Sequence, residues 1–161
     1  AEFGREAAAL WDQCGDENPD VATATRVCEL FGAATAAHIE TAKAATQGYG
    51  VDRHLTALES LARRMPVFAH PIFEDPLFTR SRAWRISSSN VTAPFLSLFG
   101  FGPVVGNGYG LGYMVQNDSI PVSITAFSGS GIDTNAEQMA DAIAGALRFI
   151  GRCHEAKSKL Q

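Results

Sequence analysis

Cysteine is scarce in this chain of 161 residues, which has three, at positions 14, 28 and 153, without CxxC or CxxH spacing. This argues against a disulfide framework or a zinc site and favours a reducing compartment. No apolar stretch approaches the about 18 residues of a membrane span. Basic residues are in the minority, with 13 Lys and Arg against 17 Asp and Glu and a net charge of −4. We therefore expect no metal site, no transmembrane segment and no nucleic-acid partner.

What is present suits a folded domain, because 46% of the residues are hydrophobic and 15 are glycine. A chain of this length can bury a real core. The first residue is Ala1 rather than Met, and no signal or transit peptide follows. We expect residues 1–161 to be a single-domain piece of a longer protein. The ending Ser158-Lys159-Leu160-Gln161 places Gln161 after the peroxisomal tripeptide, so a polar tail is the preferred interpretation.

Apolar periodicity predicts a helical region over residues 1–65, with helices at 2–14, at 21–47 after the N-cap Asp20, and from Asp52 to Pro66. His38 lies on the apolar stripe of the second helix and is predicted to be a buried core histidine. Residues 66–82 are expected to be irregular, with a short helical turn beginning at Pro76.

The region 83–128 is predicted to be rich in strands. Four strands are expected in sequence, at 83–89, 95–105, 109–116 and 120–127. Asn107-Gly108 predicts a hairpin turn with positive φ between the second and third. A capping box of Thr134 and Glu137 predicts a last helix over 134–157. The fold class is therefore α+β, with N-terminal helices, a β-meander and a C-terminal covering helix.

A run of serines ends the first predicted strand. Because alternate side chains of a strand share a face, Ser87 and Ser89 point together and Ser88 points away. Two hydroxyls on one face are able to hydrogen-bond an oxyanion or a polar substrate group. A solvent-facing strand end without function is the alternative.

Six glycines lie between Gly100 and Gly112. A phosphate-binding loop is a weak interpretation, since no Lys-Ser/Thr follows and a strand comes next. Glycines in a strand more often mark a bulge or a close backbone approach, and the spacing alone favours a tight hairpin.

The segment Asp52-Arg53-His54-Leu55 offers a helix cap, a guanidinium suited to a carboxylate, and a histidine. His54 is a candidate base and equally a packed helix residue. His70 and His154 are predicted to be exposed. No nucleophilic triad is assembled from the sequence, so the residues alone indicate half of a site.

Taken together, three motifs resemble the choline/carnitine acyltransferase family over essentially the whole chain. They are Asp52-Arg53-His54-Leu55-x-x-Leu58, Ser87-Ser88-Ser89-Asn90, and Phe101-Gly102-Pro103-Val104-Val105-x-x-Gly108-Tyr109-Gly110. The resemblance implies a chloramphenicol-acetyltransferase-like fold, of which this chain would form the C-terminal part. It also implies acyl transfer between coenzyme A and the hydroxyl of carnitine or choline, with acyl-CoA as a substrate and no permanently bound cofactor.

By the same resemblance, a histidine acts as general base and no covalent enzyme intermediate forms. In full-length members that histidine lies in an upstream motif, which none of His38, His54, His70 and His154 matches. The missing N-terminal part would therefore be a partner of this chain, together with carnitine and acyl-CoA. A mitochondrial or peroxisomal location is implied, with the cytoplasm as the alternative.

The family motifs assign roles to individual residues. Arg53 matches the arginine that binds the carnitine carboxylate, and Ser89 the serine that stabilises the oxyanion. Ser87, Phe101 and Val104 match residues around the trimethylammonium group, where an aromatic face attracts a cation. Asn90 matches a glutamine that contacts coenzyme A.

The chain also departs from the family pattern. Asn90 is one methylene shorter than glutamine, Ser88 replaces Thr, and Ala57 replaces Gly. Ile39 stands where an arginine usually contacts coenzyme A.

Phe99 occupies the acyl-chain gate position, which is bulky in short-chain members and Gly in long-chain members. A short acyl chain is therefore expected. The alternatives are a non-catalytic binding fragment that lacks the general base, or an unrelated α+β domain.

Overall fold

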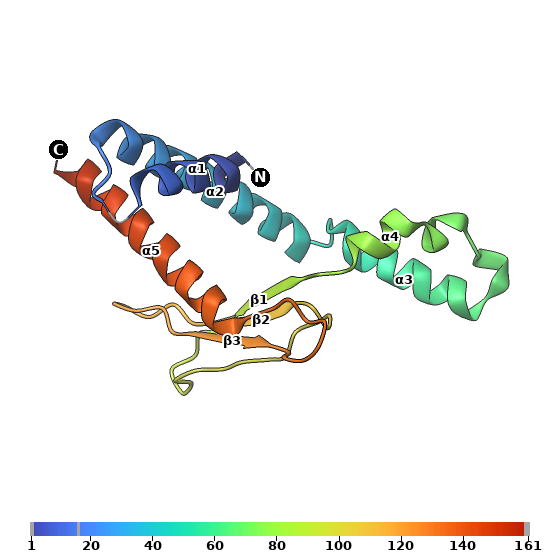
Figure 1. Ribbon diagram of the computed structural model, residues 1–161. Coiled ribbons are helices and arrows are strands. Elements are labelled where there is room, and N and C mark those ends of the chain that lie inside the picture. Colours follow the sequence, from blue (N-terminus) through green and yellow to red (C-terminus); the bar gives the residue numbers. More distant parts are fainter. Residues whose placement is uncertain (1, 16, 160–161) are drawn as a thin grey trace. The chain divides into compact units, whose positions relative to one another are not determined.

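The computed structural model describes residues 2–15 and 17–159. The chain forms two compact units, the first made of Ala1–Leu61 and Ile143–Gln161 and the second of Ala62–Ala142. Helices and a small three-stranded sheet together confirm the predicted α+β class. Figure 1 shows the order of the elements along the chain.

The first unit begins with two helices whose ends follow the predicted signals. Helix α1 spans Glu2–Cys14, and Gly15 follows it with a φ of 56°, the left-handed conformation that glycine adopts at helix ends. Helix α2 spans Val21–Thr46. The Asp20 carboxylate accepts a hydrogen bond of 2.7 Å from the backbone N–H of Thr23, which confirms Asp20 as the N-cap.

The core of the first unit forms where α1 and α2 meet the C-terminal half of α5, which spans Ala136–Ser158. Figure 1 shows α1 and α2 side by side. The buried residues of this core are Ala24, Val27, Cys28, Phe149 and Cys153. The Trp11 and Phe149 rings stack at 6.5 Å between centroids. Close packing depends on a small residue, because a Cβ on Gly145 would lie 2.8 Å from the Trp11 ring.

His38 is exposed, so its prediction as a core histidine is wrong. The buried residues of α2 end at Leu30, although its apolar stripe continues. Helix α1 has 13 residues and α2 has 26, so α1 is long enough to cover only half of α2. Periodicity identifies the apolar face of a helix but not how far a neighbour extends along it.

Between Arg64 and β1 the structure confirms the helical turn predicted at Pro76, but two further short helices lie in the part of residues 66–82 that was expected to be irregular. Helix α3 spans Val51–Arg64 and ends two residues before Pro66. Three short helical segments follow, each beginning at a proline: η1 (Pro66–Phe68), η2 (Pro71–Glu74) and α4 (Pro76–Ser81). The proline φ favours a helix start, and the missing N–H has no partner there in any case.

The sheet of the second unit differs from the predicted meander. It contains β1 (Ile86–Asn90), β2 (Tyr109–Tyr113) and β3 (Val122–Ala126), in the order β1-β2-β3. Strands β1 and β2 are parallel, whereas β2 and β3 are antiparallel. The meander prediction is wrong because residues 91–108 contain neither helix nor strand and lead back to a parallel pairing.

The turn before β2 also differs from the prediction, since neither Asn107 nor Gly108 has a positive φ. The N–H of Gly108 donates to the carbonyl of Val105 at 3.0 Å. Gly108 is buried, and a Cβ there would lie 2.9 Å from the carbonyl oxygen of Arg85. This glycine therefore serves a close backbone approach rather than a mirror-image turn.

Helix α5 is capped one residue later than predicted. The Asn135 side-chain oxygen accepts hydrogen bonds from the N–H groups of Glu137, at 2.9 Å, and Gln138, at 3.0 Å. The Thr134 hydroxyl instead donates to the carbonyl of Phe127 at 3.1 Å. The Thr134–Glu137 capping box is therefore wrong, because asparagine occupies the cap position with equal chemical suitability.

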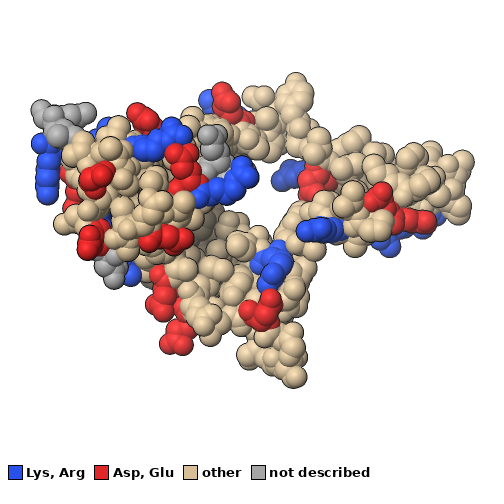
Figure 2. All heavy atoms as spheres, turned by 45° about the horizontal axis from the view of Figure 1, so that its top comes forward, with Lys and Arg blue, Asp and Glu red and all other residues tan. Residues whose placement is uncertain are grey.

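Among the described helices, none is long and apolar enough to cross a membrane. On the face in Figure 2, acidic and basic side chains of the described residues are interspersed rather than gathered by sign. This distribution fits the low net charge of the chain.

Candidate functional site

The serine run forms the edge strand β1, and its side chains alternate as predicted. Ser87 and Ser89 are half-buried, whereas Ser88 and Asn90 are exposed on the opposite face. The two candidate hydroxyls therefore share one face of the sheet. A carbonyl or oxyanion that approached this face would meet side chains two residues apart along one strand.

The sheet register extends this face across all three strands. Ser87 pairs with Gly110, which pairs with Thr125; Ser89 pairs with Gly112, which pairs with Ser123. Residues in one row of a sheet point to the same side. We call these six residues, Ser87, Ser89, Gly110, Gly112, Ser123 and Thr125, the serine face. Small side chains leave room for another segment to lie against it.

The segment Phe99–Gly102 occupies that room. A Cβ on Gly110 would overlap the carbonyl oxygen of Phe101, and one on Gly112 would lie 2.6 Å from the carbonyl oxygen of Phe99. The Thr125 hydroxyl donates a hydrogen bond to the Phe101 carbonyl. The predicted strand 95–105 is therefore wrong, because these carbonyls lie over the sheet instead of joining a ladder. The alternative of a close backbone approach at the glycines is confirmed.

Two aromatic candidates belong to the segment that lies over this face. The half-buried Phe99 and Phe101 rings stack with centroids 6.5 Å apart and planes 21° apart. Val104, two residues after the segment, is 53% exposed. The structure thus brings Ser87, Ser89 and the Phe99–Phe101 backbone to one sheet face.

Asn90 ends β1, and its side chain lies on the face opposite to Ser87 and Ser89. Its side-chain oxygen accepts a hydrogen bond of 2.8 Å from the Thr92 hydroxyl, which in turn accepts one of 3.2 Å from the N–H of Val115. A ligand carbonyl only accepts hydrogen bonds, so it would be bound by the Asn90 amide nitrogen.

Arg53 belongs to the first unit and is exposed in the first turn of α3. Its guanidinium is accessible to an anionic group of a ligand. His54 follows it and is also exposed. His70 and His154 are exposed, as predicted. The Nδ1 atom of His70 accepts a hydrogen bond of 3.2 Å from the N–H of Ile72, which gives this histidine a role as a cap.

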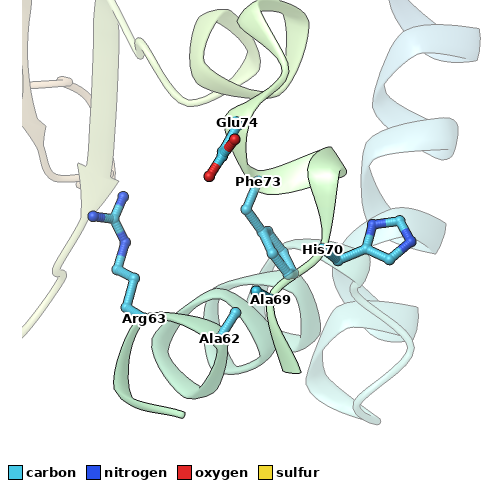
Figure 3. A pocket seen from close by; sticks show the side chains of 6 residues that line it. All are labelled: Ala62, Arg63, Ala69, His70, Phe73 and Glu74. Carbon is cyan, nitrogen blue, oxygen red and sulfur yellow. The ribbon is translucent and has the colours of Figure 1, made fainter. Parts of the chain in front are cut away.

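A separate hollow lies in the second unit, lined by Ala62, Arg63, Ala69, His70, Phe73 and Glu74. Figure 3 shows the His70 ring pointing away from Arg63 and Glu74. No predicted site residue lines it, and its titratable groups do not converge. Among the residues that the structure describes, no group of three or more His, Cys, Asp or Glu side chains could hold a metal ion.

Comparison with known proteins identifies the family of the chain. The sequence model of the family described as choline/carnitine O-acyltransferase matches residues 5–145, which include every candidate site residue. The chain belongs to the choline/carnitine O-acyltransferase family.

Relatives in this family differ in the acyl group that their names state. The mitochondrial carnitine O-acetyltransferase of Saccharomyces cerevisiae is 34% identical over 137 residues, 81% of this chain and 20% of the yeast protein. The carnitine O-acetyltransferase of Columba livia is 37% identical over 119 residues, 74% of this chain and 19% of the pigeon protein. The mitochondrial carnitine O-palmitoyltransferase 2 of Mus musculus is 35% identical over 115 residues, 67% of this chain and 18% of the mouse protein. The chain thus spans about a fifth of the length of these relatives.

One residue beside the candidate site was not predicted from the sequence. Thr125 binds a carbonyl that lies 24 residues earlier in the chain. The available signal was weak, namely a threonine alternating with Ser123 in a predicted strand. Only the register places it opposite Gly110 and beneath Phe101.

Proposed function

We propose that this chain contributes one part of the active site of a carnitine O-acyltransferase, with a fold like that of chloramphenicol acetyltransferase. The observation that supports it is the convergence of two family motifs, with Ser87 and Ser89 on the sheet face whose β2 and β3 positions Phe99–Gly102 covers. The names of the relatives support carnitine as the acceptor and mitochondria as the location.

In the proposed reaction, a general base removes the proton of the carnitine hydroxyl. The oxygen then attacks the thioester carbonyl of acyl-CoA, and the resulting oxyanion accepts a hydrogen bond from the Ser89 hydroxyl. Collapse of this intermediate breaks the carbon–sulfur bond and releases coenzyme A, whose sulfur takes the proton. One such oxyanion donor is worth about 3–4 kcal/mol in the transition state. The base belongs to the upstream family motif, and the chain's own histidines do not match it.

Binding is divided among the other candidates. Arg53 holds the carnitine carboxylate with its two-pronged guanidinium, a geometry that suits a carboxylate. Ser87, Phe101 and Val104 surround the trimethylammonium group, and an aromatic face attracts such a cation by roughly 0.5–2 kcal/mol. Asn90 contacts coenzyme A. The bulk of Phe99 limits the acyl chain to a short one.

The experiment uses the longest natural polypeptide that contains this chain, with acetyl-CoA and carnitine as substrates and release of the coenzyme A thiol as the readout. Ser89→Ala should lower kcat by about 10²–10³-fold. Ser88→Ala is the matched control, because the neighbouring hydroxyl is exposed on the opposite face. A loss below about threefold in Ser89→Ala contradicts the oxyanion role.

The same assay tests the acyl gate. The wild-type protein should turn over acetyl-CoA faster than palmitoyl-CoA, and Phe99→Gly should shift this ratio toward palmitoyl-CoA. A wild-type preference for palmitoyl-CoA refutes the short-chain assignment. Calorimetry with carnitine and coenzyme A distinguishes an enzyme from a binding module: binding without turnover by the longest polypeptide favours the module.

A further inference from the structure

Thr125 joins two segments of the candidate site at one atom. Its hydroxyl donates to the carbonyl of Phe101 and, at 3.3 Å, to the carbonyl of Gly110. Both carbonyls belong to the glycine-rich motif, the first in the irregular segment and the second in β2. The hydroxyl therefore pins Phe101 to the strand that pairs with Ser87.

The pinned segment has no regular structure of its own. Residues 91–108 lie outside helices and strands, so no ladder of hydrogen bonds fixes their position over the sheet. Gly110 has no side chain in this row, and a Cβ there would lie 2.7 Å from the Thr125 hydroxyl oxygen. The missing side chain of Gly110 leaves space for the Phe101 carbonyl, and the hydrogen bond from the Thr125 hydroxyl holds the carbonyl in that space.

We propose that Thr125 is a positioning residue of the acyl transfer, which sets the Phe101 ring and, through it, the Phe99 ring. The two rings stack, so a displaced Phe101 backbone moves both. This inference rests on the proposed function, in which Phe101 faces the trimethylammonium group and Phe99 limits the acyl chain. Loss of the Thr125 hydroxyl then weakens carnitine binding and changes acyl-chain selectivity together.

The kinetic test compares three variants of the longest natural polypeptide that contains the chain. Thr125→Val keeps the shape but removes the donor and leaves the part-buried Phe101 carbonyl unpaired. Thr125→Ser keeps the donor. Thr134→Val is the matched control, because Thr134 also donates to a carbonyl of the second unit, that of Phe127.

Thr125→Val should raise the KM for carnitine about three- to tenfold, the effect of one lost hydrogen bond. It should also change the ratio of kcat/KM for octanoyl-CoA to that for acetyl-CoA. Thr125→Ser and Thr134→Val should stay within about twofold of wild type in both quantities. A Thr125→Val protein with both quantities unchanged, or a Thr125→Ser protein that behaves like Thr125→Val, overturns the proposal.

Amide hydrogen exchange separates this proposal from the proposed function. Exchange over residues 99–102 should be faster in Thr125→Val than in Thr125→Ser or Thr134→Val, whether or not the protein has activity. If exchange is equal in all variants, Thr125 does not position the segment. If wild type shows no acyl transfer while exchange responds as expected, the proposed function fails instead. Where Thr125→Val does not fold, Thr125→Ala takes its place in both measurements.

Discussion

Gly112 offers a strong test of the packing that builds the serine face. This glycine is buried in β2, the middle strand of the sheet, with Ser89 on one side and Ser123 on the other. In Gly112→Ala, the new Cβ would lie 2.6 Å from the carbonyl oxygen of Phe99 and 3.2 Å from the Cα of Gly100. Both neighbours are backbone atoms, so they move only if the whole segment moves. The φ of Gly112 is not positive, so the cost is steric rather than conformational.

Overpacking of this kind typically costs about 1–3 kcal/mol. For a protein of this size, 1 kcal/mol corresponds to roughly 2–4 °C in Tm. Gly112→Ala should therefore lower the Tm by about 2–12 °C in thermal unfolding followed by circular dichroism. The control is Gly106→Ala, since a Cβ on Gly106 has no neighbour within 4 Å and its φ is not positive. This control should lose no stability. Equal Tm values for the two variants would refute the close approach of Phe99–Gly102 to β2.

Two further predictions concern the ends and the core of the helices. Asn135→Ala should lower the free energy of unfolding by about 1 kcal/mol in urea, because two backbone donors of α5 lose their acceptor. A larger loss in Glu137→Ala would contradict the Asn135 cap and support the Thr134–Glu137 capping box. Burial and the neighbouring Cys28 and Cys14 thiols raise the pKa of Cys153 to about 11 from 9.0. The folded state holds this proton more tightly than the unfolded state does. The contribution of Cys153 to the free energy of unfolding is therefore fully present below pH 9.0 and is lost as the pH rises toward about 11. Cys153→Ala should remove that part of the pH dependence, and an unchanged profile would contradict the assignment.

Local chemistry determined most helix boundaries. Gly15 ends α1, Asp20 caps α2, and the prolines mark the short helices that follow α3. Each signal acts within a few residues of itself, so no distant contact was needed to interpret it. Alternation in β1 is also local, which explains why Ser87 and Ser89 were correctly assigned to one face.

Predictions that depended on distant partners fared differently. Whether His38 is buried depends on how far neighbouring helices extend, and α1 is too short to cover the C-terminal half of α2. The segment 95–105 has the apolar content of a strand, yet its carbonyls lie over the glycines of β2. Propensity describes what a segment tolerates, whereas the available partners decide what it forms.

The sequence by itself therefore determined the family, the helices, and the candidate residues Arg53, Ser87, Ser89 and Phe101, because motifs and caps are encoded within short spans. Only the tertiary structure decided the mixed pairing of the sheet and the rows that align Ser87 and Ser89 with two glycines. It alone showed Thr125 bonded to Phe101 across 24 positions of the chain. Register and close backbone approach arise from pairing between distant segments, and neither leaves a pattern in one stretch of sequence.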